Sequence, residues 1–474
     1  MKSSTRPPVT TRFAIMMGLL LSSCLSAEET KEARGFQDPV VAEDGRLFDS
    51  SGREILLRGF NARVRGLFDV TFDDGRVALQ EIPLFTADDC GTMANDLGQN
   101  FLRLPVNWSG IEPIRGAYDD EYLTQILEVI RGCWRHGVYT LVDIHQDAFS
   151  KNIGEDGAPL WAILPTPVEL LEGPLTEDEL VKRRVSPTVV SAFKSLFNNV
   201  DGLLDSYAAM AAKLGQVLAD EPGVMGLELM NEPVFVDDLA AFHERVGRAV
   251  RKVAPNLTLV FEPNALRNFL DSWPVSTPFP FEDAVYAPHL YTDVFTNGWA
   301  GRDVEKLHES VGAAKEEAEE HGTPLLIGEY GNSPKTETGL LWLSEALNKM
   351  DDVKASGAVW LYEEWSQGGW GLYGRAESER GPLRVDFARI IARPFPQAID
   401  GRLVSSVFDE ERLTLMVEIA TAGTGEHLLS APSLLYPDGV SVHCDDELIS
   451  TLTVSSGRVA FKCQGTRIML RPLP

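Results

Sequence analysis

The chain has 474 residues, of which 44% are hydrophobic and 24% charged, a composition typical of a folded protein with room for one large and one small domain. Its formal net charge of −27 argues against a nucleic-acid-binding function, because phosphates need a basic surface. The same charge disfavours a purely electrostatic attraction to anionic membranes.

The first residues are predicted to be an export signal. Lys2, Arg6 and Arg12 precede an apolar stretch, residues 13–21, that is too short to span a bilayer. Its end, Leu-Ser-Ser-Cys, resembles a bacterial lipobox and predicts lipidation of Cys24; the alternative is ordinary cleavage nearby, with Cys24 discarded. We therefore expect a signal peptide over residues 1–24, a linker over 25–44, and a mature protein that is secreted or anchored in the cell envelope.

From residue 54 onward, short β-rich apolar runs alternate with amphipathic helical patterns. Eight such runs are present: residues 54–60, 100–105, 139–145, 224–230, 257–263, 284–289, 324–329 and 357–362. Helices are predicted near residues 201–220, 239–253 and 304–321, where apolar residues recur every three or four positions. This alternation predicts a (β/α)₈ barrel over residues 45–394, with its active site at the carboxyl ends of the strands.

Two segments exceed a minimal barrel. Residues 150–200 form a long insertion after the third strand, where loops commonly shape binding. Residues 395–474 carry short alternating strands with Gly and Pro turns, which predict a small β-sandwich.

The cysteines allow two expectations. Cys444 and Cys463 lie in strand-like stretches of the C-terminal segment and could cross-link neighbouring strands. Cys90 and Cys133 are placed near opposite ends of two parallel helices, so we expect them to stay free.

Side chains capable of chemistry stand at six of the predicted strand ends. They are Arg103, His145, Asp147, Asn231, Glu232, His289, Tyr291, Glu329 and Trp360. Packing alone does not explain this set, because barrel interiors favour branched apolar residues. Strand ends meet in one mouth, so Glu232 and Glu329 can face each other there.

Two facing carboxyl groups predict a retaining glycosidase, with one as acid/base and one as nucleophile. We expect Arg103 to keep the nucleophile Glu329 ionised, and Tyr291 to orient it. Asn231 can bind the sugar 2-hydroxyl. Glu232 is expected in a less polar setting that keeps it protonated until it donates. Trp360 can form an apolar floor under the sugar ring.

Six short motifs in this order carry a family resemblance: LRGFN (57–61), FLRLPVNW (101–108), MNEP (230–233), PHLY (288–291), IGEYG (327–331) and Trp360. Over about residues 45–390 the chain resembles glycoside hydrolase family five, whose members are retaining (β/α)₈ enzymes. VDIHQDAFS (142–150), DGAPLWA (156–162) and the appended β-domain are typical of its endoglycoceramidase branch.

The resemblance implies hydrolysis of the bond between an oligosaccharide and ceramide in a glycosphingolipid. It also implies Glu232 as acid/base, Glu329 as nucleophile, and sugar contacts from His145, Asp147, Trp161, Asn231, Tyr291 and Trp360. Two segments depart from the pattern, Ala62–Arg65 after the first strand and residues 363–371 after the eighth. Because both could change which glycan is accepted, a galactose-linked ceramide is as plausible as a glucose-linked one.

Several alternatives stay open. The enzyme could act on a soluble β-glucan or on another lipid or aryl glycoside, or the chain could be a carbohydrate-binding lipoprotein without activity. We expect no cofactor and no metal, because no compact ligand motif of His, Asp or Cys is present. We also expect a monomer that meets its substrate at a membrane or micelle surface.

The insertion after the third strand is rich in large apolar residues between Trp161 and Phe197. It could line a ceramide site through Leu164, Val190, Phe193 and Phe197, since exposed apolar patches usually mark a binding surface. Alternatively, it packs on itself as a small core. The C-terminal domain likewise either supports the barrel or holds the enzyme at a lipid surface.

Overall fold

The computed structural model describes residues 40–275, 277–295, 303–365, 369–376, 379–423, 425–452 and 456–473. The predicted signal peptide, Cys24 and most of the predicted linker lie outside these residues. Among the helices of the described ranges, none has both the length and the apolarity needed to cross a membrane.

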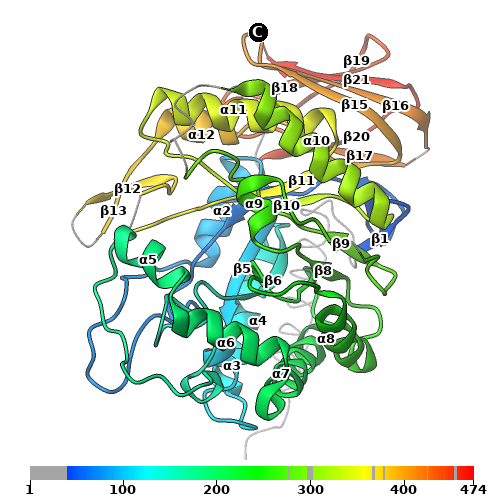
Figure 1. The fold of residues 1–474 in the computed structure, drawn as a ribbon. Coiled ribbons are helices and arrows are strands. Elements are labelled where there is room, and N and C mark those ends of the chain that lie inside the picture. Colours follow the sequence, from blue (N-terminus) through cyan, green and yellow to red (C-terminus); the bar gives the residue numbers. More distant parts are fainter. Residues whose placement is uncertain are drawn as a thin grey trace, which may run out of the picture.

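Eight parallel strands form the predicted (β/α)₈ barrel (Figure 1). In barrel order they are β4 (Arg58–Asn61), β5 (Phe101–Asn107), β6 (Tyr139–His145), β7 (Val224–Glu228), β8 (Leu259–Phe261), β9 (Ala284–Tyr286), β10 (Leu326–Tyr330) and β11 (Ser356–Val359). Backbone hydrogen bonds from Tyr286 to Pro324 and from Leu290 to Glu329 join β9 to β10 and close the barrel. All eight strands are buried, which explains their near-continuous apolar runs.

Helices cover the outside of the barrel. They are α2 (Ala87–Asn95), α4 (Asp120–Trp134), α7 (Leu203–Leu218), α8 (Ala240–Val253), α10 (Val304–His321), α11 (Glu337–Asp352) and α12 (Val385–Ile391). Helix α4 shows why the sequence folds this way. Asp119 caps its first turn by accepting from the backbone N–H groups of Glu121 and Tyr122, and Leu123, Ile126 and Ile130 are buried.

The loops at the carboxyl ends of the strands carry the shorter elements. These are α3 (Trp108–Ile111), η1 (Leu160–Ala162), α5 (Glu177–Arg184), α6 (Pro187–Phe197), η2 (Val200–Gly202), α9 (Leu266–Leu270), β12 (Tyr373–Ala376) and β13 (Glu379–Leu383). Helices α5 and α6 begin at the cap residues Thr176 and Ser186, whose side chains accept from backbone N–H groups in the first turn.

Two sheets form the second domain, packed beside α11 and α12 (Figure 1). The five-stranded sheet contains β15 (Gly401–Asp409), β16 (Thr414–Ala422), β21 (Arg467–Pro472), β18 (Val440–Cys444) and β19 (Glu447–Leu452). The six-stranded sheet contains β1 (Val41–Glu43), β2 (Arg46–Phe48), β3 (Glu54–Ile55), β14 (Pro396–Ile399), β17 (Glu426–Ser430) and β20 (Arg458–Lys462).

Three strands of this second domain come from the amino-terminal part of the chain. The sequence predicts residues 41–55 to belong to the linker and the barrel, but β3 pairs with β14, so β1, β2 and β3 extend the C-terminal sheet. The first predicted run, residues 54–60, therefore divides between two sheets, and only β4 enters the barrel. The pairing joins segments about 340 residues apart, which a local pattern does not reveal.

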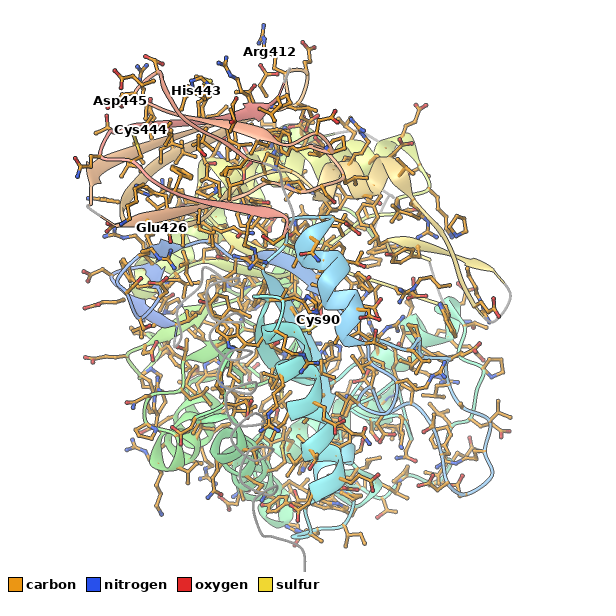
Figure 2. The ribbon with its side chains drawn as sticks, turned by 180° about the vertical axis from the view of Figure 1, so that it is seen from behind. Cys90, Arg412, Glu426, His443, Cys444 and Asp445 are labelled. Carbon is orange, nitrogen blue, oxygen red and sulfur yellow. A yellow bond between two sulfur atoms is a disulfide. The ribbon has the colours of Figure 1, made fainter. Side chains whose placement is uncertain are left out.

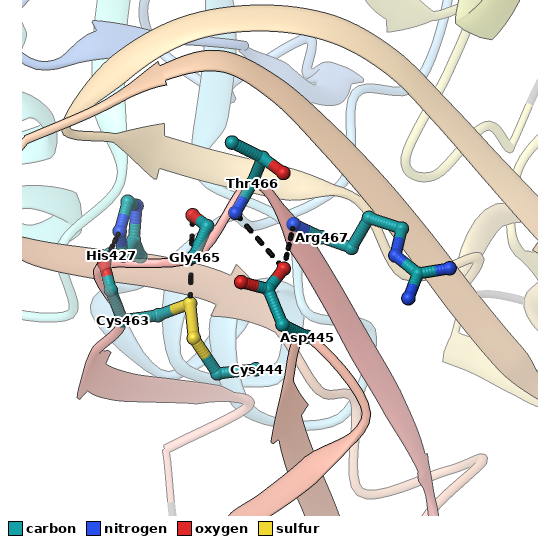
Figure 3. The surroundings of a disulfide bond; sticks show 7 residues. All are labelled: His427, Cys444, Asp445, Cys463, Gly465, Thr466 and Arg467. Carbon is teal, nitrogen blue, oxygen red and sulfur yellow. Dashed lines mark hydrogen bonds between the residues drawn. A yellow bond between two sulfur atoms is a disulfide. The ribbon is translucent and has the colours of Figure 1, made fainter.

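Cys444 and Cys463 form a disulfide, with their Cα atoms 5.8 Å apart (Figure 3). Cys444 ends β18 in one sheet, whereas Cys463 follows β20 in the other. The bond therefore joins the two sheets rather than neighbouring strands of one sheet. Beside it, Asp445 accepts from the backbone N–H groups of Thr466 and Arg467 at 3.1 and 3.0 Å.

The expectation that Cys90 and Cys133 stay free is wrong, because the two residues form a disulfide with Cα atoms 5.0 Å apart. Helices α2 and α4 are displaced along their axes, so the start of α2 lies beside the end of α4 (Figure 2). Ala87, the first residue of α2, approaches Gly132 near the end of α4. If α2 and α4 began and ended at the same level along their axes, Cys90 and Cys133 would lie too far apart to bond.

Helix α6 belongs to the core. Val189, Phe193 and Leu196 are buried, and the ring of Phe193 contacts Phe149 and Phe235 at centroid distances of 5.1 and 5.8 Å. Helix α6 therefore packs into the main core of the barrel rather than on the insertion itself, and Phe193 is not a solvent-facing lipid contact.

Candidate active site

A cavity of about 490 Å³ opens at the carboxyl ends of the barrel strands. Six of the predicted site residues line it: Asp147, Asn231, Glu232, Tyr291, Glu329 and Trp360. They follow or end β6, β7, β9, β10 and β11, so distant parts of the chain meet here as the barrel topology requires.

Glu232 and Glu329 face each other across this cavity. One carboxyl oxygen of each, together with a ring nitrogen of His289, lies within a group whose atoms are all within 4.8 Å of one another. Retaining glycosidases hold their two carboxyl groups about 5–5.5 Å apart, whereas inverting enzymes need about 6.5–9.5 Å to admit a water. The spacing fits a double displacement through a covalent intermediate.

Two donors fix Glu329. Arg103 Nη1 donates to Oε1 at 2.8 Å, and the hydroxyl of Tyr291 donates to Oε2 at 2.8 Å. Burial, and next the negative charge of Glu329, raise the pKa of Tyr291 well above its usual range. Tyr291 therefore keeps its proton and orients the carboxylate, and the roles that we predicted for Arg103 and Tyr291 have matching geometry.

Arg103 is also the centre of a buried charge network. Its Nε donates to Glu228 at 2.9 Å, and Nη2 donates to Asn231 at 2.9 Å and lies 3.0 Å from Asp143. Burial raises the pKa of Glu228, but the charge of Arg103 and its hydrogen bonds outweigh it and lower that pKa to about 2. The network connects three strands below the mouth.

Sequence reasoning missed several members of this network: Asn61, Asp143, Glu228, Glu262 and Asn268. A signal was present, because Asp143, Glu228 and Glu262 each interrupt an otherwise apolar strand run. A carboxyl group in a buried strand needs a charged or hydrogen-bonding partner.

The surroundings of Glu232 differ from our expectation of a less polar setting. His289 Nδ1 lies 3.0 Å from Glu232 Oε1, and Asn268 donates to the same oxygen at 3.1 Å. Burial raises the pKa of Glu232, but the contacts with His289, the charge of Arg184 and the Asn268 hydrogen bond outweigh it and lower that pKa to about 2. These contacts favour the carboxylate form of Glu232, in contrast to the protonated acid that we expect from the sequence.

His145 and Trp360 form a stacked pair, with ring centroids 5.8 Å apart and planes 9° apart. Burial lowers the pKa of His145 to about 3, so the ring is neutral, and its Nδ1 lies 2.5 Å from Asp143. Within the described part of the chain, its Nε2 is buried and has no hydrogen-bond partner.

Asp147 and Trp161 occupy different places. Asp147 lines the cavity and pairs with Arg184 of α5 at 2.9 Å. Trp161 does not line this cavity; its indole N–H donates to the backbone oxygen of Glu112 at 3.1 Å, and its ring packs edge-on against Trp108. Of the sugar contacts implied by the resemblance, Trp161 and the buried His145 do not line this cavity, whereas Asp147, Asn231, Tyr291 and Trp360 do.

The departures from the family pattern meet at the cavity. Arg63 Nη2 lies 3.3 Å from Glu364, and its Nη1 donates to Gln80 at 2.7 Å. Glu364 also accepts from the backbone N–H of Trp370 at 2.8 Å. Arg65 points elsewhere and donates to the backbone oxygen of Ile82. Arg63 and Glu364 therefore add a charged pair to the wall of the cavity.

Large apolar side chains complete the lining. Phe269, Phe295 and Trp370 contact Tyr291 or one another, and the Phe295 and Trp370 rings are stacked with centroids 5.5 Å apart. Val181 of α5 and Val185, which follows the helix, are 65% and 68% exposed, although both line the cavity. The cavity thus offers hydrogen-bonding groups and apolar surface together.

Potential metal ligands also gather here, in three groups: His145 with Asp147 and Asp156, Glu228 with Glu262 and His289, and Glu232 with His289 and Glu329. In each group at least one carboxylate already contacts an arginine, Arg184 in the first and Arg103 in the other two. Guanidinium groups supply the positive charge that a metal would otherwise bring.

The model of the family described as Cellulase (glycosyl hydrolase family 5) matches residues 48–369. Endoglycoceramidase I of Rhodococcus hoagii (strain 103S) is 26% identical over 436 residues, covering 85% of this chain and 82% of that protein. The endoglycoceramidase of Cyanea nozakii is 26% identical over 446 residues, covering 84% and 83%.

Solved structures agree in fold. A crystal structure of endogalactoceramidase superposes with a TM-score of 0.75 at 25% identity, covering 92% of this chain and 99% of that one. The lactosyl-enzyme intermediate of endo-glycoceramidase II from Rhodococcus sp. superposes at 0.71 with 23% identity, covering 92% and 100%. With the family model spanning more than half of the chain and a pair of carboxyl groups at retaining distance, this protein belongs to glycosyl hydrolase family 5 and is a retaining glycoside hydrolase.

Proposed function

We propose that the protein is an endo-β-glycosidase that cleaves the bond between the glycan and ceramide of a glycosphingolipid. One observation carries this proposal: the facing pair Glu232 and Glu329 opens into a cavity lined both by charged groups and by exposed apolar side chains. An amphiphile needs both surfaces, since its sugars require hydrogen bonds and its hydrocarbon gains about 0.8 kcal/mol for each methylene removed from water.

In this proposal Glu329 attacks the anomeric carbon, and Glu232 protonates the departing ceramide oxygen. The glycosyl group is then bonded to Glu329, and Glu232 takes a proton from the water that releases it. Asn231 lines the same cavity; one N–H of its amide donates to the backbone oxygen of Gln146 at 3.0 Å, and the other can meet the sugar 2-hydroxyl. Trp360, stacked on His145, supplies the apolar floor for the ring.

The two endoglycoceramidases named above are matched over more than four fifths of their length, which supports the same substrate class here. The galactose-linked type is supported by the likeness to endogalactoceramidase. The Arg63–Glu364 pair supports a glycan preference of its own, because it places a charged donor and acceptor at the cavity wall.

The test is to incubate the purified protein with galactosyl-, glucosyl- and lactosylceramide and with soluble β-glucans, and to identify products by mass. Intact glycan and ceramide from at least one glycolipid are expected. Release of oligosaccharide from β-glucan alone would favour the soluble-substrate alternative.

We also infer export and lipidation at Cys24, supported by the basic and apolar pattern of residues 1–24. Expression with a labelled fatty acid should label the wild type and not Cys24→Ser. Label in neither protein would mean ordinary cleavage. A monomer is the expected oligomeric state, which light scattering measures directly.

A further inference from the structure

The side chain of Gln146 joins the ends of two neighbouring barrel strands. Gln146 follows β6 directly, and its amide nitrogen donates to two backbone oxygens in the segment after β7. The oxygen of Asn231 lies 2.9 Å away and that of Glu232 lies 3.0 Å away. In return, the side-chain amide of Asn231 donates to the backbone oxygen of Gln146 at 3.0 Å. Gln146 therefore holds the segment that carries Glu232.

The main chain of Glu232 depends on this contact more than its neighbour does. Asn231 has two further anchors, because its N–H donates to the backbone oxygen of Ile144 at 3.0 Å and its Oδ1 accepts from Arg103 at 2.9 Å. Among the described residues, Gln146 is the one hydrogen-bond partner of the Glu232 main chain. Loss of the Gln146 amide would therefore leave a buried carbonyl group of Glu232 unsatisfied.

Glu232 needs such support because of its backbone conformation. Its φ is 42°, in the left-handed region that residues with a side chain adopt seldom and at a cost in free energy. A conformation of this kind persists where the surrounding contacts enforce it. If the backbone relaxed to an ordinary conformation, the carboxyl group would move away from His289 and Asn268, which contact its Oε1 at 3.0 and 3.1 Å.

Gln146 is itself held in place. Its Oε1 accepts from the backbone N–H of Phe149 at 2.9 Å, and this bond closes a turn in which Ala148 and Phe149 also have positive φ, 54° and 75°. The backbone of Gly157 packs against the stem of the side chain, since a Cβ atom at position 157 would lie 2.5 Å from the Cβ of Gln146. The amide therefore has little room to move, and its oxygen and its nitrogen are both engaged.

We propose that Gln146 is a positioning residue that holds Glu232 in its left-handed conformation, with the carboxyl group directed at the leaving-group oxygen. The inference rests on the proposed role of Glu232 as the acid/base. Gln146 acts through Glu232, because it is buried and does not line the cavity, and it neither gives nor takes a proton. Misplacing a reacting group by about 1 Å can lower the rate by about 10²-fold, which sets the size of the expected effect.

The test compares Gln146→Met, Gln146→Glu and a matched control, Gln99→Met. Gln146→Met keeps the length of the side chain and loses every hydrogen bond of the amide. Gln146→Glu keeps an oxygen for the N–H of Phe149 and loses the two donors. Gln99 is also a buried amide that donates to two backbone oxygens, those of Leu97 and Ile391 at 3.1 and 2.8 Å, but it precedes β5 at the opposite end of the barrel.

For each variant, kcat/KM is measured with a phenyl and a dinitrophenyl glycoside of the sugar that the wild type cleaves. This quantity reports the first chemical step, in which only the phenyl leaving group needs the acid. Both Gln146 variants should lose about 10²-fold with the phenyl glycoside and less than about tenfold with the dinitrophenyl glycoside. Gln99→Met should leave the ratio of the two values unchanged. This ratio does not depend on the fraction of folded protein, which thermal unfolding measures separately.

The same change in a Glu232→Gln background shows whether Gln146 acts through Glu232. Once the acid is absent, adding Gln146→Met should lower kcat/KM for the phenyl glycoside by less than about tenfold, because the two residues serve one step. Losses that multiply, as they do for independent sites, would overturn the proposal.

Equal losses on both glycosides in the Gln146 variants would also overturn it and make Gln146 a general support of the barrel mouth. Wild-type values in Gln146→Glu would do the same, because the turn at Phe149 would then be all that the side chain maintains. Failure of the underlying assignment is separate: if Glu232→Gln alone shows no dependence on the leaving group, Glu232 is not the acid. The aryl glycosides report on this step whether or not a glycolipid is the natural substrate.

Discussion

Arg103 Nη1 donates a hydrogen bond of 2.8 Å to Glu329 from a side chain that is itself fully buried. The guanidinium does not depend on this contact alone, because its Nε and Nη2 are held by Glu228. Glu329, the proposed nucleophile, can therefore be substituted without leaving a buried arginine unpaired.

Glu329→Gln should abolish turnover while preserving the fold. The substitution removes the attacking oxygen and keeps the volume, and Arg103 retains Glu228 as an anionic partner. We expect kcat to fall by at least about 10³-fold, since covalent catalysis has no substitute group here. Calorimetric titration with the glycan should show retained binding. A variant with residual kcat above a tenth of wild type would exclude Glu329 as nucleophile.

Glu232→Gln should discriminate between leaving groups. An ordinary alcohol such as the ceramide hydroxyl needs protonation, so kcat/KM for the glycolipid should fall by about 10²–10⁴-fold. An activated aryl glycoside should lose much less in the same step. Equal losses on both substrates would assign another role to Glu232.

Stability should fall between neutral and acid pH, in part because of His243. Burial lowers the pKa of this histidine to about 3, whereas in the unfolded chain it is about 6.5. Between these values the unfolded state binds a proton that the folded state does not, so the unfolding free energy decreases as pH falls. His145 contributes with the same sign, because burial lowers its pKa to about 3 as well.

In His243→Leu, the unfolded chain no longer binds a proton at position 243. The slope of unfolding free energy between pH 6.5 and 3 should become smaller by up to about 1.4 kcal/mol per pH unit. Urea titrations at a series of pH values give the unfolding free energy at each pH, and hence this slope. A slope equal to that of the wild type would mean that His243 is protonated in the folded protein.

The barrel could be predicted because its strands are buried and therefore keep apolar runs that end at polar mouth residues. The pairing of β3 with β14 could not be predicted from the sequence, because β3 has only two residues and its partner strand lies far along the chain. The Cys90–Cys133 bond depends on an axial displacement of α2 against α4, which helical periodicity does not encode. The ionised state of Glu232 depends on His289 and Asn268, which come from different loops.

Helix α5, rather than α6, is the part of the insertion suited to meet the lipid. Val181 on α5 and Val185, the residue that caps its C-terminus, line the cavity and are largely exposed, whereas Phe193 on α6 is buried. The ion pair between Arg184 and Asp147 attaches the end of α5 to the mouth. Substrate hydrocarbon can therefore contact the valines while the sugar lies near Asp147.

Val181→Asp and Val185→Asp should lower kcat/KM for the glycolipid by about tenfold or more each, because burying a valine side chain stabilises a contact by about 1.5–3 kcal/mol. They should spare a water-soluble aryl glycoside of the same sugar. Val404→Asp, at an exposed valine of β15 in the second domain, is the matched control and should change neither value.

Phe193→Asp should instead lower the unfolding midpoint, since it places a charge in the core. Assays at constant detergent compare the substrates. Equal losses of kcat/KM on the glycolipid and the aryl glycoside in the two valine variants would show that α5 only supports the barrel mouth. The lipid would then be recognised elsewhere in the cavity, and Phe269, Phe295 and Trp370 would be the next residues to substitute.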